Sequence, residues 1–303
     1  MFRGIFPPTV TLFKEDGSLD PEANQCHHDF LIESGVQGLF ILATTGEFMH
    51  MNLKDREQHA AETMQHIAGR TLVIVGTGTT STRETIRLSR HAQGVGADAV
   101  AIITPYFWTL SERELIGHLS AVANAVDIPI FVYNFPAYSN FNIGSETLVS
   151  LVREHRNIAG VMDAIDSLEH LRQRVQLVKA VNPEFRVLAG SDGHLLNILQ
   201  LGGDGTVPAT ANIAPDRHVK VFNAYERRDY QRALELMPAV LSCLDMFRIT
   251  GSFHSVVKEA MVMAGIATSA TPRQPALPLT AHSRARLREV LARANLLPAP
   301  EET

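Results

Sequence analysis

Two threonines, a glycine and a glutamate, Thr44-Thr45-Gly46-Glu47, directly follow a short apolar run. Hydroxyl groups beside a glycine turn can gather with backbone N–H groups around an anion such as a carboxylate. The same residues could instead form a turn that caps the next helix. The sequence leaves both interpretations open, and we take Thr44 and Thr45 as candidates for binding a carboxylate.

A tyrosine ends another apolar run, in the segment Tyr133-Asn134-Phe135-Pro136. At the end of a strand its hydroxyl could face a pocket and donate or accept a proton. A core tyrosine with a hydrogen-bonded hydroxyl is the structural alternative. Tyr133 is therefore a candidate acid–base residue.

A third run ends in Val161-Met162-Asp163. Successive side chains of a strand point to opposite faces, so Met162 and Asp163 cannot both face the same space. If Met162 faces the interior, an unbranched apolar side chain lies where a polar catalytic group would be expected. Methionine in such a position ordinarily only fills space.

A fourth run ends in Gly190-Ser191-Asp192-Gly193-His194, and we expect Asp192 to cap a helix rather than to act as a catalyst. The histidines show no spacing of the HExxH kind. A metal site built from Glu47, Asp163, Asp192 and His194 is conceivable, but no ligand pattern supports it. We therefore predict no metal and no cofactor.

Eight apolar runs carry these residues, and most begin roughly thirty residues apart, the length of one βα unit. Their near-continuous Val, Ile, Leu and Ala content is typical of parallel strands buried on both faces. We predict an α/β fold, a (β/α)8 TIM barrel, with an open doubly wound sheet as the alternative. Active sites of such barrels lie at the C-terminal ends of the strands. The runs begin at Gly4, Gly38, Thr71, Ala99, Pro129, Ile158, Arg186 and Gly205.

Helix starts lie between these runs. Each has a capping residue followed by a proline or by an acidic residue, which satisfies or complements the free N–H groups of a first turn. The four starts are Asp20-Pro21, Ser81 to Glu84, Ser111 to Glu114, and Asp166 to Glu169.

The βα alternation stops near residue 225. Three helical patterns follow, near 227–247, 252–265 and 281–296, with no low-complexity linker before them. We predict a barrel over residues 1–225 and a C-terminal helical extension over 226–303 that packs on it and is not an independent domain.

Composition excludes several classes of function. The chain has 303 residues, 45% hydrophobic and 19% charged, with a formal net charge of −5, which gives no reason to expect nucleic acid or an anionic membrane as a partner. No apolar run reaches the length of a membrane span, and the N-terminus does not resemble a signal peptide. Cys26 and Cys243 are expected to be buried reduced thiols. The prediction is a cytoplasmic protein.

Taken together, these segments resemble the dihydrodipicolinate synthase / N-acetylneuraminate lyase family of class I aldolases, over essentially the whole chain. Within the family, these motifs are most similar to those of the 2-keto-3-deoxygluconate aldolase-like branch. The resemblance rests on Gly38-Leu39-Phe40 with Thr44-Thr45-Gly46-Glu47, on Thr104-Pro105-Tyr106, on Tyr133-Asn134-Phe135-Pro136-Ala137, on Gly160-Val161-Met162-Asp163, on Asp166-Ser167 with His170-Leu171, and on Leu201-Gly202-Gly203-Asp204-Gly205.

The resemblance implies a carbon–carbon lyase in which a lysine on the sixth strand forms an imine with pyruvate or another 2-oxo acid. It implies that Thr44 and Thr45 hold the substrate carboxylate, that Tyr133 relays a proton, and that the backbone of Val207 lines the site. It also implies a homotetramer, a dimer of dimers. The small-molecule partner would be a 2-oxo acid or a sugar acid.

The implied lysine position is residue 162, and it holds methionine. A thioether cannot form an imine, so this resemblance predicts impaired or absent imine chemistry. The other departures are Phe107 in place of a tyrosine that reaches the neighbouring subunit, Tyr138 in place of an arginine for a second carboxylate, and Asn140 in place of a glycine. Dihydrodipicolinate synthesis is therefore not expected.

No other lysine is expected to replace it. Four of the five lysines lie in helical patterns, and Lys14 lies in a polar turn that we expect to be solvated. The lysines are Lys14, Lys54, Lys179, Lys220 and Lys258.

Three functions remain open. The chain could be a 2-oxo acid aldolase by lineage that has lost its nucleophile. It could be a non-catalytic binder of a 2-oxo or sugar acid that uses Thr44 and Thr45. It could also be a lyase or hydratase that uses acid–base or metal chemistry instead of an imine.

Overall fold

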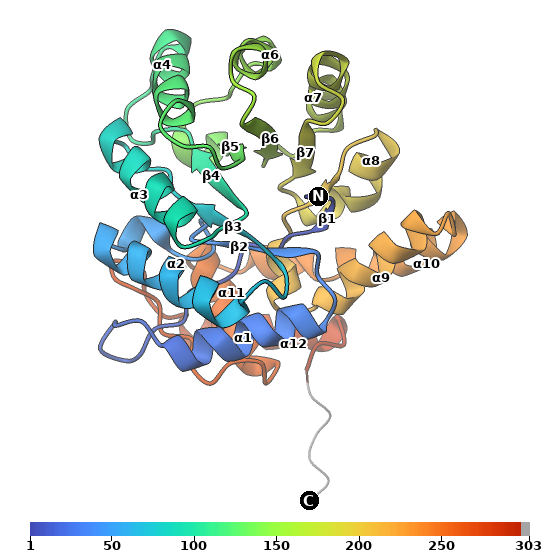
Figure 1. Cartoon of the computed structure of the whole chain (residues 1–303). Coiled ribbons are helices and arrows are strands. Elements are labelled where there is room, and N and C mark those ends of the chain that lie inside the picture. The colour runs from blue at the N-terminus through green and yellow to red at the C-terminus, as the bar shows by residue number, and fades with distance from the viewer. Residues whose placement is uncertain (298–303) are drawn as a thin grey trace, which may run out of the picture.

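Eight short apolar runs form parallel strands in the computed structural model, which describes residues 1–297 (Figure 1). Hydrogen bonding follows the order β1-β8-β7-β6-β5-β4-β3-β2. The ring closes where the backbone N–H of Thr9 donates to the carbonyl of Phe40 at 2.9 Å. The predicted (β/α)8 barrel is confirmed, and the open sheet is excluded. The strands are β1 (Gly4–Ile5), β2 (Gly38–Ile41), β3 (Leu72–Gly76), β4 (Ala99–Ile103), β5 (Ile130–Asn134), β6 (Ile158–Asp163), β7 (Arg186–Ala189) and β8 (Gly205–Thr206).

The first and last strands are much shorter than their apolar runs. Prolines follow both strands after one intervening residue: Pro7 and Pro8 come after Phe6 at the end of β1, and Pro208 comes after Val207 at the end of β8. Proline has no N–H to donate, so it interrupts the ladder of hydrogen bonds between strands. The rest of each run continues as irregular buried chain toward the C-terminal end of the barrel.

Helices surround the strands, as Figure 1 shows for α3, α4, α6, α7 and α8. Asp20 accepts the N–H of Ala23 at 3.1 Å, and Ser111 with Glu114 forms a complete capping box, as predicted. The helices of the barrel are α1 (Pro21–Glu33), α2 (Leu53–Ile67), α3 (Thr82–Gly94), α4 (Glu112–Ala123), α5 (Pro136–Ser139), α6 (Ser145–Glu154), α7 (Leu168–Val181), α8 (Leu195–Gln200) and α9 (Pro215–Glu226), with short 3₁₀ helices η1 (Phe48–His50), η2 (Asp192–His194) and η3 (Ala209–Asn212).

One predicted helix start is wrong by a residue. Ser167, not Asp166, caps α7 by accepting the N–H of His170 at 3.3 Å. Asp166 is instead paired with His194 at 2.6 Å, across the loops that follow β6 and β7. A serine and an aspartate side by side cannot be distinguished as caps by spacing alone.

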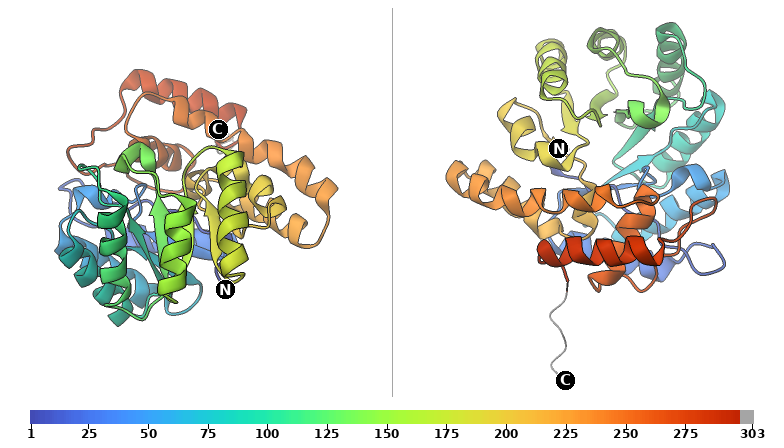
Figure 2. Two further views of the ribbon diagram at one scale, coloured as in Figure 1. Left: turned by 90° about the horizontal axis from the view of Figure 1, so that it is seen from above. Right: turned by 180° about the vertical axis from the view of Figure 1, so that it is seen from behind.

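The C-terminal segment packs along one side of the barrel (Figure 2). It contains α10 (Tyr230–Leu241), the 3₁₀ helix η4 (Leu244–Arg248), α11 (Phe253–Met263) and α12 (Ala281–Arg293). Apolar side chains of η4, α11 and α12 form a second core together with Val10, Leu12 and Ile213 of the barrel, whereas α10 packs on the main core. Within the described residues, no helix is long and apolar enough to cross a membrane.

The two cysteines differ in burial. Cys243 is buried, as predicted, whereas Cys26 is exposed, which corrects the prediction for this residue. The buried face of α1 is made by residues three to four apart, and Cys26 lies on the opposite, solvent side of the helix. That buried face consists of Asn24, His27, His28 and Leu31.

Three of the buried side chains of α1 and α2 are histidines. His27, His28 and His59 are each at most 2% exposed, and the rings of His28 and His59 lie 6.1 Å apart. His27 Nε2 lies 2.9 Å from the Asn212 Oδ1 atom. Burial lowers the pKa of His27 and of His59 to about 4, and it lowers the pKa of His28 well below its ordinary value.

These histidines predict an acid-sensitive fold. Because their folded pKa lies below the unfolded value of 6.5, the neutral rings stabilise the fold fully above pH 6.5, and that stability is lost as the pH falls toward 4. At pH 5 we expect His27 and His59 each to lower the free energy of unfolding by about 2 kcal/mol. Thermal unfolding of His59→Leu should therefore depend less steeply on pH between 7 and 4.5 than that of the unchanged protein. An unchanged pH dependence would contradict the assignment.

Candidate active site

A pocket of about 170 Å³ lies at the C-terminal ends of the barrel strands. All five site residues predicted from the sequence line it, although they come from four different loops and strands. Its walls are formed by Pro8, Thr44, Thr45, Tyr133, Phe135, Met162, Ala164, Gly190, Ser191, Asp192, Val207, Ala209, Leu244, Phe247 and Phe253.

The threonine pair and the tyrosine lie together at the buried end of this pocket. Thr44 Oγ1 is 3.3 Å from the hydroxyl of Tyr133, and the two threonines are at most 4% exposed. Gly46 lets the loop pass close to the chain that follows β1, because a Cβ at this position would lie 3.0 Å from the carbonyl oxygen of Thr9. The alternative interpretation of Thr44 as a helix cap is not what the structure shows: η1 follows Glu47 without a side-chain cap bond, and Asn52 caps α2.

Burial raises the pKa of Tyr133 far above its ordinary value. The phenol therefore stays protonated throughout the neutral range and can donate a hydrogen bond or a proton. Thr44 accepts from it or donates to it, so a ligand oxygen placed between them would find two hydroxyl groups. This arrangement suits a carboxylate or a carbonyl oxygen.

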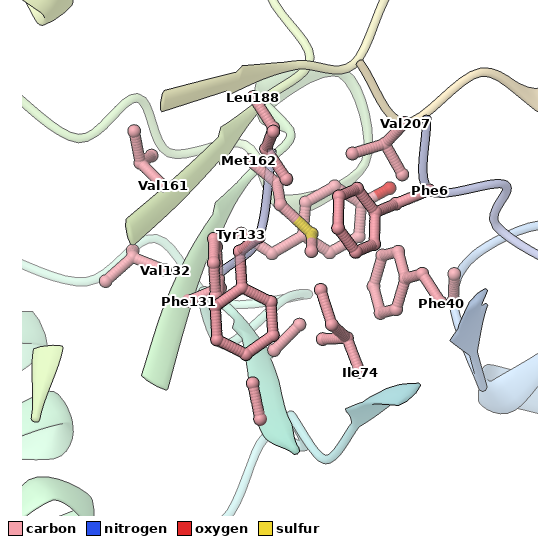
Figure 3. Packing of buried hydrophobic residues seen from close by; sticks show 14 of the residues in the cluster. Phe6, Phe40, Ile74, Phe131, Val132, Tyr133, Val161, Met162, Leu188 and Val207 are labelled. Atoms are coloured by element: carbon pink, nitrogen blue, oxygen red, sulfur yellow. The ribbon is translucent and has the colours of Figure 1, made fainter. Parts of the chain in front are cut away.

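Met162 is fully buried and extends from β6 into the barrel interior (Figure 3). In the sheet it lies opposite Tyr133 of β5 and Leu188 of β7. Asp163 points to the other side of the strand, as the alternation predicts. The face that could carry a catalytic group therefore presents a thioether.

All five lysines lie within residues 1–297, which the structure describes, and none of them lines this pocket. Lys14 and Lys54 are exposed, and Lys179 and Lys220 pair with Asp204 and Asp216. Lys258 is buried, but its ammonium group pairs with Glu47 and donates to the carbonyl of Thr271 at 3.0 Å. The amines are thus directed away from the pocket or engaged elsewhere.

Asp163 anchors β6 to the helix that follows it. Its carboxylate accepts from the Nε of Arg174 at 2.8 Å, and His170 Nε2 lies at the same distance; Asp163 and Arg174 are both fully buried. Burial alone would raise the pKa of Asp163, but His170 and Arg174 hold it below its ordinary value. The charge is therefore retained, and it holds the backbone of Met162 in place.

Asp192 does not cap the helix that follows its own strand, which corrects the prediction: it is the first residue of η2, and its carboxylate binds the start of another helix. Its carboxylate accepts the backbone N–H groups of Ala209 at 3.2 Å and Thr210 at 2.8 Å, and the hydroxyl of Thr210 also donates to it. It thereby satisfies the start of η3. The contact crosses from the β7 loop to the β8 loop, and no local spacing indicates such a pairing.

The four residues considered as metal ligands do not come together. Asp163, Asp192 and His194 each have the separate partners given above, and Glu47 lies in another cluster. Glu47, His50 and His254 have ligand atoms within 4.8 Å of one another and could hold a cation.

Lys258 already supplies a positive charge to that cluster. Glu47 is fully buried, pairs with this ammonium group and accepts the N–H of Arg273 at 2.8 Å. Burial lowers the pKa of Lys258, and the Glu47 carboxylate opposes that effect. The chemistry of the cluster fits an internal ion pair that fastens the β2 loop to α11.

The outer part of the pocket was not found by sequence reasoning. Leu244 and Phe247 come from η4, Phe253 begins α11, and Phe135 follows β5. All four are half-buried and apolar. Three of them lie beyond the repeating βα units, in a segment whose periodicity predicts only helices packing on the barrel.

An eight-stranded parallel barrel with hydroxyl groups gathered at the C-terminal strand ends defines the class of (β/α)8 barrel proteins with a small-molecule site. A family model, the dihydrodipicolinate synthetase family, matches residues 1–294. The chain belongs to this family.

Named relatives place it beside 2-keto-3-deoxy sugar acid aldolases. The chain is 39% identical over 296 residues to the putative 2-dehydro-3-deoxy-D-gluconate aldolase YagE of Escherichia coli K12, with 98% of each chain covered. It is 37% identical to the probable 2-dehydro-3-deoxy-D-pentonate aldolase YjhH of the same organism, covering 98% of this chain and 99% of that one.

Solved structures agree. The crystal structure of YagE in complex with pyruvate has a TM-score of 0.95 and 39% identity, covering 98% of this chain and 99% of that one. The structure of dihydrodipicolinate synthase from Aquifex aeolicus has a TM-score of 0.92 and 29% identity, covering 99% of this chain and 100% of that one. The resemblance inferred from the sequence is confirmed at the level of the family, and YagE is a relative known to bind pyruvate.

Proposed function

We propose that this protein binds a 2-oxo acid in the pocket without forming an imine to it. The observation that carries the proposal is that Thr44, Thr45 and Tyr133 line one pocket together with Met162, while the lysines lie elsewhere. The pyruvate complex of YagE supports a 2-oxo acid as the ligand class. Aldol chemistry through an imine would then be impaired or absent.

Met162 is proposed to occupy the position of the family's imine-forming lysine. It lies on β6 beside Tyr133, with its side chain in the pocket wall. Methionine matches the length of a lysine stem and carries no charge, so the barrel can accommodate it. Its sulfur has no proton to lose and cannot condense with a ketone.

The carboxylate of the ligand is proposed to bind at Thr44 and Thr45, with Tyr133 donating to a ligand oxygen and the backbone of Val207 forming part of the wall. Thr45→Val removes one hydroxyl at nearly constant volume. Since a hydrogen bond to a charged group contributes about 1.5–3 kcal/mol, pyruvate affinity should fall by about 10- to 100-fold. Isothermal titration calorimetry measures this directly.

Thr45→Ser is the matched control, because it keeps the hydroxyl and should retain most of the affinity. Equal affinity of the unchanged protein, Thr45→Val and Thr45→Ser would show that the carboxylate does not bind there. Failure of the unchanged protein to bind any 2-oxo acid would overturn the proposal itself.

A second candidate is a lyase or hydratase that acts by acid–base chemistry. The contact between Tyr133 and Thr44 favours it, because a protonated phenol at the buried end of the pocket can deliver a proton without an imine. Proton exchange at C3 of a bound 2-oxo acid, followed by NMR in deuterated water, tests this. Exchange that disappears in Tyr133→Phe would support it, and exchange at the rate of free ligand would exclude it.

A homotetramer built as a dimer of dimers is proposed from the family. Phe107 and Trp108 support a partner surface, because they are 92% and 72% exposed on the loop after β4. Exposed aromatic side chains are typical of interface positions. Sedimentation equilibrium should give four copies, and a monomer would contradict the proposal. A cytoplasmic location and the lack of nucleic-acid, membrane, metal and cofactor partners stay predictions.

A further inference from the structure

We propose that the pocket selects 2-oxo acids with an apolar or aromatic tail over polyhydroxylated sugar acids. This inference rests on the proposed function, because it assumes that the 2-oxo acid head binds at Thr44, Thr45 and Tyr133. It concerns the rest of the ligand. It also sets the chain apart from what the names of its sugar-acid relatives suggest.

The two ends of the pocket differ in burial and in polarity. Thr44, Thr45 and Tyr133 are at most 9% exposed and form the inner end, where the hydroxyl groups gather. Phe135, Leu244, Phe247 and Phe253 are half-buried and line the outer part. A ligand whose head reaches the threonines must therefore place its tail among these apolar side chains.

Aromatic rings give the outer wall a defined surface. Phe247 and Phe253 are stacked, with ring centroids 4.9 Å apart and an angle of 24° between the planes. Phe135 contacts Tyr138 edge to face, with centroids 4.7 Å apart. Burying an apolar or aromatic group of the ligand against these rings stabilises the complex, whereas the rings offer a hydroxyl group no hydrogen-bond partner.

Few polar groups of the wall are free to bind a polyol. Ser191 supplies a hydroxyl, but the carboxylate of Asp192 is occupied by the N–H groups of Ala209 and Thr210 and by the Thr210 hydroxyl. Among the described residues that line the pocket there is no lysine or arginine. Apart from any bond to Ser191, the hydroxyl groups of a sugar acid that enter this part of the pocket would lose their hydrogen bonds to water, which costs free energy.

A titration series with one head and different tails tests the inference. Calorimetry would compare pyruvate, 2-oxobutanoate, 4-methyl-2-oxopentanoate, phenylpyruvate and 2-keto-3-deoxygluconate against the unchanged protein. Since a fully buried methylene strengthens binding by about fourfold, we expect 4-methyl-2-oxopentanoate to bind at least about tenfold more tightly than pyruvate. 2-Keto-3-deoxygluconate should bind no more tightly than pyruvate.

The wall itself is tested by Phe253→Ala and Phe247→Ala, whose thermal midpoints are measured alongside to show that each variant is folded at the temperature of the titration. Each should reduce the preference for 4-methyl-2-oxopentanoate over pyruvate by about three- to tenfold. Leu234→Ala on α10 is the control, because Leu234 is 57% exposed and does not line the pocket, and it should change neither affinity.

The outcomes separate the two proposals. Pyruvate binding with no gain from an apolar tail, or tighter binding of 2-keto-3-deoxygluconate, overturns the inference and leaves the proposed function standing. Loss of the preference only in the two phenylalanine variants supports the inference. No binding of any 2-oxo acid overturns the proposed function and the inference with it.

Discussion

Replacing Met162 by lysine is expected to let the protein form a covalent adduct with pyruvate that the unchanged protein does not form. The new amine would extend from β6 into the pocket beside Tyr133, where the 2-oxo acid head is proposed to bind. Burial lowers the pKa of a lysine, so a substantial part of the amine would be uncharged and nucleophilic near neutral pH. Borohydride reduction in the presence of pyruvate, followed by intact mass measurement, should show one reduced adduct on each chain.

Two variants control this experiment. Met162→Leu keeps an apolar side chain of similar volume and should give no adduct. Met162→Lys combined with Tyr133→Phe should still be trapped, but with turnover of a 2-keto-3-deoxy acid lower by about 10²- to 10⁴-fold than Met162→Lys alone, because proton relay is lost. An adduct on the unchanged protein would show that another amine reaches the ketone, and the account of Met162 would be wrong.

The largest expected effect on stability belongs to Arg174. Its guanidinium is fully buried against Asp163, donates to Ser145 at 3.1 Å and also donates to the carbonyl of Ile143. Arg174→Met leaves the Asp163 carboxylate buried with only His170 and Asn134 as side-chain partners. Removing one member of a buried ion pair costs about 3–5 kcal/mol, and urea denaturation should show a loss of this size in the free energy of unfolding.

The same helix offers a matched control. Arg172 on α7 pairs with Glu169 at 2.6 Å, but both side chains are largely exposed, so Arg172→Met should cost less than about 1 kcal/mol. The double variant Asp163→Asn, Arg174→Met removes both charges and should be more stable than Arg174→Met alone. Equal free energies of unfolding for Arg174→Met and Arg172→Met would contradict the prediction that breaking the buried pair costs more than breaking the exposed one.

Much of the barrel could be predicted from the sequence because its strands and helix starts are marked by residues close together in the chain. Apolar runs spaced one βα unit apart indicate the parallel strands, and capping residues such as Asp20 and Ser111 mark helix starts. Parallel strands place their C-terminal ends together, so Thr44, Tyr133 and Met162 could be named as candidates near one another, and the family resemblance implied their roles in one site. Alternation along β6 was enough to place Met162 and Asp163 on opposite faces.

What sequence reasoning missed depends on contacts between distant segments. Asp192 caps η3 from a neighbouring loop, and Lys258 neutralises Glu47 across more than two hundred residues. Neither pairing leaves a spacing signal. The positions of Phe247 and Phe253 follow from how η4 and α11 pack on the barrel, which helical periodicity alone does not determine.

The location of Phe247 and Phe253 has a consequence for the divergence of such proteins. The groups proposed to bind the ligand head belong to the barrel, whereas three of the four apolar side chains around the tail come from the short stretch 244–253. Mutations in that stretch can change which tail is accepted while β2, β5 and β6 stay intact. Replacing residues 244–253 of this chain with the equivalent segment of a relative should therefore change its preference among ligand tails to that of the relative.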